Sequence, residues 1–210
     1  MIEQASIAFA TLFATIGPID LGAVYAGLTG SMSVKQKKAI AIKGTLIGAL
    51  ILLIFALAGK GLLHFFGISL PALRTSGGIL LLLIGIDMVF ARDSGATSMT
   101  DDEDREAHEK TDIAVFPIAT PLIAGPGAMG AVMLLMAQAD GNMTHQLIVI
   151  LALFLNLALA LACLLLAGKL QRLLGVMGVQ VITRVMGVLL SALAVQFIFD
   201  GILQSGLILR

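Results

Sequence analysis

The chain has few charged residues, no tryptophan and a single cysteine, and these scarcities exclude several classes of protein. Charged side chains make up 12% of the 210 residues and the mean hydropathy is +1.04, which excludes an ordinary soluble domain. Cys163 is the only cysteine, so an intrachain disulfide and a dithiol relay are excluded. No paired-histidine metal motif, serine elbow or phosphate loop occurs, so we expect no enzyme activity, no metal and no cofactor.

Six apolar runs are long enough to cross a bilayer. A hydrocarbon core of about 30 Å requires about 20 helical residues, and six such runs leave no room for a separate soluble domain. We therefore predict an all-α integral membrane protein, a single transmembrane domain of six helices. The first run lacks the basic leader of a cleaved signal peptide. The predicted spans are Ile7–Leu28, Thr45–Phe66, Ala72–Phe90, Val115–Ala137, Leu147–Ala167 and Val181–Leu203.

The connector between the two halves, residues 91–112, is the only markedly polar stretch. It holds eight of the thirteen acidic residues, and such a segment cannot bury apolar surface, so we expect a solvated linker. The alternative is a metal site made by these acids and His108, but their spacing matches no cation-binding motif. We divide the chain into repeat 1 (1–91), an acidic cytoplasmic linker (92–112) and repeat 2 (113–210).

The basic residues predict the orientation in the membrane. With six spans, ten of the thirteen lysines and arginines fall on the side of the first, third and fifth loops. Cytoplasmic loops carry an excess of positive charge. We therefore expect these three loops in the cytoplasm and both termini outside.

The pattern G-P-x-x-x-G-A-V occurs twice, at Gly17–Val24 and at Gly125–Val132, 108 residues apart. Further matches follow in the same order, among them Arg74 with Arg184. We interpret this order as an old duplication. Because each copy contains three spans, the second copy enters the membrane from the opposite side, which predicts two inverted three-helix repeats.

Both copies of the pattern lie where a helix is expected to break. Proline lacks an amide donor and clashes with the preceding turn, and glycine lets the backbone change direction. We predict that the first and fourth helices are broken at Gly17-Pro18 and Gly125-Pro126. The first amides of each new half-helix lack partners and suit a carboxylate or another small anion. We expect the two breaks to meet near the membrane centre in a small pocket; the alternative is a pair of packing kinks.

Few polar side chains are placed to serve this pocket. Asp20 either caps the free amides of its half-helix or acts as a coupling residue for a proton or sodium ion. Secondary candidates are Asn156 and Gln196, which can instead join helices, and Arg184, which can instead anchor to lipid headgroups. The predicted solute-binding residues are Thr15, Gly17, Pro18, Asp20, Gly22, Thr120, Pro121, Gly125, Pro126, Gly127 and Gly130.

The segment from Phe116 to Ala128 resembles the central signature of the MarC-type family of bacterial inner-membrane proteins, also grouped as neutral amino acid transporters. The segments 77–88 and 183–201 are similar too, so the resemblance covers essentially the whole chain. It implies a multi-pass protein of the bacterial inner membrane with inverted three-helix repeats, as in the lysine-exporter superfamily. The family usually has Asp or Asn directly before the first-repeat proline, where this chain has Gly17 and carries Asp20 instead.

These features predict a secondary transporter of a small zwitterionic or anionic solute, with neutral amino acids as the first choice. The mechanism would be alternating access around the paired broken helices. The expected partners are this solute, a proton or sodium ion and membrane lipid, and no nucleic acid. The alternative is a non-transporting membrane scaffold or stress-response interaction protein in which the kinks only shape packing.

Overall fold

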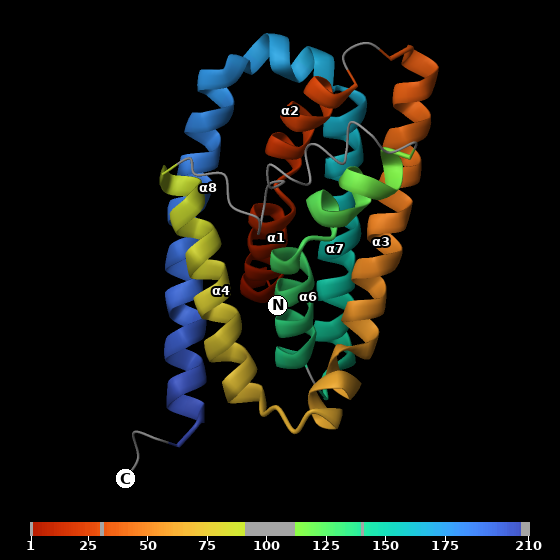
Figure 1. Ribbon diagram of the computed structural model, residues 1–210. Coiled ribbons are helices and arrows are strands. Elements are labelled where there is room, and N and C mark those ends of the chain that lie inside the picture. Colours follow the sequence, from red (N-terminus) through yellow and green to blue (C-terminus); the bar gives the residue numbers. More distant parts are fainter. Residues whose placement is uncertain (1, 30–31, 91–111, 140, 207–210) are drawn as a thin grey trace.

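The computed structural model describes residues 2–29, 32–90, 112–139 and 141–206 (Figure 1). These residues form helices and no strands, which confirms the all-α prediction. Except for Asp112, the predicted acidic linker lies outside the described residues, as does His108. The elements are α1 (Ile2–Ile16), α2 (Pro18–Leu28), α3 (Val34–Phe65), α4 (Leu70–Phe90), η1 (Ala114–Ile123), α6 (Pro126–Gln138), α7 (Met143–Leu165) and α8 (Ala167–Gln204).

The helices are long and apolar enough to cross a membrane. Five segments meet this condition in the described residues, and a sixth is added if η1 and α6, bent by 52°, form one span. Large apolar side chains cover the outside, among them Phe65 at 82% and Leu57 at 71% exposure, and such a surface suits lipid. The predicted multi-pass membrane architecture is therefore confirmed. The five segments are Ile2–Ala26, Val34–Gly59, Leu70–Phe90, Met143–Leu165 and Gln180–Gln204.

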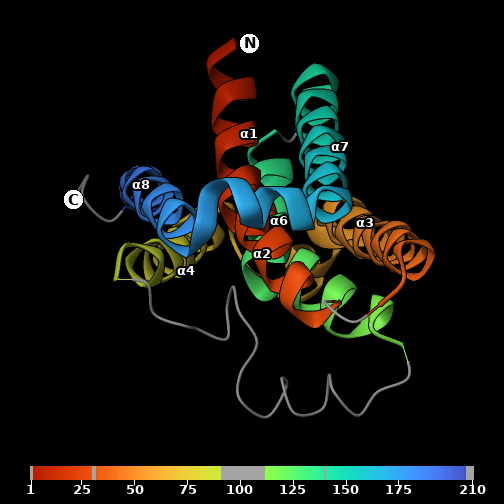
Figure 2. The same cartoon turned by 90° about the horizontal axis from the view of Figure 1, so that it is seen from above.

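The helices form a central group with two flanks (Figures 1 and 2). α1, α2 and α6 lie in the middle, α4 and α8 lie side by side on one flank, and α3 and α7 lie on the other. The α2–α3 and α7–α8 connections lie at one end of the bundle, the upper end in Figure 1. The α3–α4 and α6–α7 connections lie at the lower end.

Glycines bring α4 and α8 into close contact over much of their length. A Cβ added at Gly85 would lie 2.4 Å from the Oγ of Ser191 and 2.9 Å from the carbonyl oxygen of Gly187. Gly78 and Gly201 are equally tight against the facing helix. Small residues allow the backbones of two membrane helices to approach, so this interface leaves no room for a side chain at these positions.

Two pre-proline residues make η1 irregular. Phe116 (φ −129°, ψ 124°) and Thr120 (φ −137°, ψ 122°) are extended within an otherwise helical segment. A proline ring clashes with the helical conformation of the residue before it, so Pro117 and Pro121 cause this geometry. α6 then starts at Pro126.

Gly17 separates α1 from α2. Its φ of 57° lies in the left-handed region, which glycine adopts without a Cβ clash. Helical hydrogen bonds still bridge the site: the Gly17 amide donates to the Phe13 carbonyl, and the Leu21 amide donates to the Gly17 carbonyl, both at 2.9 Å. The helix is thus interrupted at one residue while Ile2–Ala26 remains long enough to cross a membrane as one segment.

Another glycine with a positive φ, Gly175, bends α8. Gly175 (φ 61°, ψ −179°) divides this element, and the part before it lies across the upper end of the bundle in Figure 1. The predicted sixth span, Val181–Leu203, lies entirely in the part after the bend. The helical segment before Gly175 was not predicted from the sequence.

Candidate functional site

The carboxylate of Asp20 lies at the interruption between α1 and α2. Its Oδ1 accepts a hydrogen bond from the hydroxyl of Thr183 in α8 at 2.5 Å. Its Oδ2 lies 3.6 Å from the position that a Cβ would take at Gly17. The sequence predicted Asp20 and Gly17 but not Thr183, which is 163 residues from Asp20 and is brought to it only by the packing of α2 against α8.

The cavity at this interruption is small. Its volume is about 10 Å³, and its lining includes Gly17, Pro18 and Asp20 together with Met88 of α4 and Thr183 of α8. Such a volume holds about one water molecule. Gly125 and Pro126 are not among the lining residues, so the two interruptions do not share this cavity.

The second interruption, between η1 and α6, is packed against α3. A Cβ at Gly44 would lie 2.6 Å from a methyl carbon of Ile118, and a Cβ at Gly48 would lie 2.6 Å from a methyl carbon of Ile123. The glycines of α3 thus let η1 approach closely. Of the predicted site residues here, Gly125 and Gly127 are buried, Thr120, Pro121 and Gly130 are half-buried, and Pro126 is exposed.

Two predicted polar residues bond within and between helices. The hydroxyl of Thr15 donates to the carbonyl of Thr11 in its own helix at 2.8 Å. Asn156 is fully buried, and its Nδ2 donates to the carbonyls of Phe9 in α1 (3.3 Å) and Ala152 (2.9 Å). Asn156 therefore joins α7 to α1, while its Oδ1 and the Oγ1 of Thr11 are buried without a partner.

The other two secondary candidates are Arg184 and Gln196. Arg184 is exposed on α8. Gln196 donates from Nε2 to Oδ1 of Asp200 at 2.9 Å, and both residues line a cavity near the C-terminal end of α8. Neither lines the cavity at Gly17. Gly22 is buried in α2.

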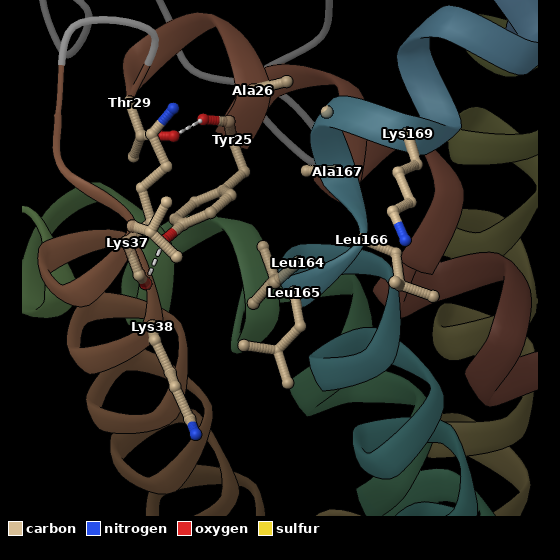
Figure 3. Close-up of a pocket in the computed structure, with 12 residues that line it drawn as sticks. Tyr25, Ala26, Thr29, Lys37, Lys38, Leu164, Leu165, Leu166, Ala167 and Lys169 are labelled. Atoms are coloured by element: carbon tan, nitrogen blue, oxygen red, sulfur yellow. Dashed lines mark hydrogen bonds between the residues drawn. The ribbon is translucent and has the colours of Figure 1, made fainter.

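A larger pocket opens at the upper end of the bundle (Figure 3). Its volume is about 690 Å³, and it lies between α2, α3, α7 and the start of α8. The hydroxyl of Tyr25 donates to the backbone carbonyl of Lys37, and that of Thr29 donates to the carbonyl of Tyr25 at 2.7 Å. Lys37, Lys38 and Lys169 are among the lining residues, so the pocket attracts anions. The sequence did not predict this pocket.

The helix of α6 has free space beside Gly130. A Cβ added at Gly130 would meet no described atom within 4 Å, whereas one at Gly17 would require a strained positive φ. Gly130→Ala should therefore keep or raise stability by up to about 1 kcal/mol. Gly17→Ala should lower it by about 1–2 kcal/mol. Thermal unfolding in detergent measures both, and Gly130→Ala proving the less stable variant would contradict this description of α6.

Comparison with known proteins identifies close relatives. The sequence profile described as MarC family integral membrane protein matches residues 3–205. The UPF0056 membrane protein MJ1677 of Methanocaldococcus jannaschii is 41% identical over 201 residues, covering 96% of this chain and 97% of the relative. The UPF0056 membrane protein YvbG of Bacillus subtilis is 34% identical over 194 residues, covering 92% of each chain. These names state no solute. No solved structure matches the chain significantly.

Proposed function

Because the chain belongs to the MarC family of integral membrane proteins, we propose that it is a secondary transporter of a small zwitterionic or anionic solute, with neutral amino acids as the first choice. It is a carrier and not an enzyme. The observation that carries this proposal is the carboxylate of Asp20 at a helix interruption inside the bundle, hydrogen-bonded to Thr183 of another helix. Ionisable side chains within membrane helices are costly and are retained for function.

Two inverted three-helix repeats, α1–α4 and η1–α8, are part of this proposal. In Figure 1, α3 runs downward and α7 upward, and α4 runs upward and α8 downward. The contacts between helices are exchanged between the two repeats in the same manner. α1 packs on α7, and its counterpart η1 packs on α3. Likewise, α2 packs on α8, and its counterpart α6 packs on α4. Such an exchange supports a pseudo-two-fold axis in the membrane plane.

In the proposed mechanism the half-helices α2 and α6 begin at the solute path. Their first amides carry partial positive charge and suit a carboxylate. Asp20 takes up the coupling proton or sodium ion, and its bond to Thr183 closes the path between α2 and α8. Opening requires that this bond be released, because the cavity of about 10 Å³ admits no amino acid.

We further propose a cytoplasmic location for the upper end, in a bacterial inner membrane or its equivalent. The upper end holds the lysine-rich start of α3 and the α7–α8 connection with Lys169, as the positive-inside rule requires. At the same end Lys43 of α3 donates to Asp112 before η1 and holds the pKa of that carboxyl below its usual value. Lipid headgroups would surround this end, and both termini would lie outside.

Purified protein in liposomes tests the transport function. With an imposed pH or sodium gradient, a panel of neutral amino acids and small carboxylates should include at least one solute that accumulates. An ionophore that collapses the gradient should abolish the accumulation, and protein-free liposomes provide the background. No movement of any panel solute would contradict transport.

Two observations favour the scaffold alternative. The cavity at Gly17 is small, and Thr15 and Asn156 bond within and between helices, as residues of a packing kink would. This alternative predicts no flux in the same liposomes.

A further inference from the structure

Another cavity lies at the lower end of the bundle, opposite the pocket of Figure 3. Its volume is about 220 Å³, and residues of α1, α4, α6, α7 and α8 line it. Leu135, Val149 and Phe197 form apolar walls, and Arg74 and Asp200 supply charges of opposite sign. Pockets for drug-sized ligands span about 300–1,000 Å³, so this one suits a smaller solute.

Arg74 is the cationic group of this cavity. Its Nε is buried without a hydrogen-bond partner, and no carboxylate pairs with it among the residues that the structure describes. A buried guanidinium atom without a partner is unfavourable, particularly in a membrane protein. The planar group of arginine binds a carboxylate through two parallel hydrogen bonds, so a solute carboxylate would satisfy it.

Asp200 is the anionic group. Its Oδ1 is held by the amide of Gln196 at 2.9 Å, and within the described ranges no lysine or arginine neutralises it. Arg74 and Asp200 each adjoin the contact at which α4 meets α8, where a Cβ at Gly201 would lie 2.4 Å from the Oγ1 of Thr75. Two opposite charges thus face one cavity from neighbouring helices without forming an ion pair.

A face of α1 leads from this cavity to Gly17. Gln4 and Ala8 line the cavity, and Thr11 and Thr15 follow at helical spacing on the same side. Ala8, Thr11 and Thr15 are buried, and the hydroxyl of Thr11 has no partner there. Buried small and polar side chains of α1 therefore lie between the cavity and the interruption.

We propose, building on the transport function above, that this cavity is the outer binding pocket for a small zwitterion of the α-amino acid type. Arg74 binds its carboxylate and Asp200 binds its ammonium group. The apolar walls contact an uncharged side chain, which gives the preference for neutral amino acids. A zwitterionic lipid headgroup with a phosphate and an ammonium group has related chemistry, and the test below separates the two sources.

Equilibrium binding of radiolabelled L-alanine to the purified protein tests this assignment. Acetate and ethylamine, which each carry one of the two charges, should compete at least about ten-fold more weakly than unlabelled alanine. Arg74→Gln and Asp200→Asn should each weaken alanine binding by about ten-fold or more. Lys35→Gln and Asp87→Asn remove charges elsewhere and should leave it unchanged.

The solvent accessibility of the cavity provides a second test, in which no charged residue is replaced. Gln138 lines the cavity, and Gln138→Cys in a Cys163→Ala background should react with a water-soluble thiol reagent. L-alanine should slow this reaction several-fold. Protection by phosphatidylethanolamine vesicles and not by alanine would overturn the assignment in favour of a lipid headgroup.

The outcomes of these experiments test the proposed binding pocket and the proposed transport function separately. If Arg74→Gln and Asp200→Asn both keep the wild-type flux and the wild-type affinity for alanine, the cavity is not the binding pocket. The proposed transport function would then be unaffected. Alanine binding that depends on these two charges, without any flux, would support the cavity as a binding pocket and contradict transport. A variant that fails to fold, seen by size-exclusion chromatography, leaves the cysteine measurement to decide.

Discussion

Replacing Gly85 by leucine should abolish the folded protein. Gly85 faces α8 with the carbonyl oxygen of Gly187 2.9 Å and the Oγ of Ser191 2.4 Å from the position of an added Cβ. Backbone atoms cannot turn aside as a flexible side chain can, so the two helices must separate. Overpacking costs about 1–3 kcal/mol even where side chains can adjust, and we expect a loss of about 3 kcal/mol or more here.

Size-exclusion chromatography and thermal unfolding in detergent measure this effect. The matched control is Gly61→Leu, because Gly61 is exposed on α3 and an added Cβ would meet no described atom within 4 Å. The control should elute and melt as the wild type does. A Gly85→Leu protein with the wild-type melting temperature would show that α4 and α8 do not pack as described.

Replacing Asp20 by asparagine should abolish gradient-driven accumulation of solute while the protein stays folded. Asparagine keeps the shape of the side chain and an oxygen that can accept the hydrogen bond from Thr183. It cannot take up a proton and has no charge for a sodium ion. We expect accumulation to fall by about ten- to hundred-fold, the value of a charge-assisted interaction, and stability to change by less than about 1 kcal/mol.

This substitution also decides between the two roles of Asp20. Asparagine caps helices as well as aspartate does, so a capping role predicts unchanged transport. A coupling role predicts that exchange of labelled for unlabelled solute persists while accumulation against a gradient is lost. Asp87→Asn in α4 is the control and should retain both activities. Accumulation equal to the wild type in Asp20→Asn would rule out coupling.

Local chemistry made part of the fold predictable. The apolar runs are longer than soluble helices require, so the spans followed from composition and length. The irregular geometry of η1 is explained by Pro117 and Pro121, because a proline acts on the residue directly before it. The bend of α8 at Gly175 was missed, since glycine in an apolar run permits a bend without requiring one.

The arrangement of the site depends on contacts between distant residues and was therefore only partly predictable. Asp20 was predicted from its proline neighbour, but its bond to Thr183 comes from the packing of α2 on α8. Arg74 and Asp200 received no binding role from the sequence, because nothing near either residue in the chain indicates a shared cavity. Gln196 was predicted to reach the solute or to join helices, and its described hydrogen bond runs to Asp200 of its own helix.

The glycine contact between α4 and α8 constrains how the protein can move. These helices come from different halves of the chain, yet they form the most extensive packing between two helices in the described residues. Densely packed elements shift as one rigid body. Conformational exchange would then displace the α4–α8 pair against the central helices, and the Asp20–Thr183 bond and the cavity of Arg74 and Asp200 both lie on that sliding boundary.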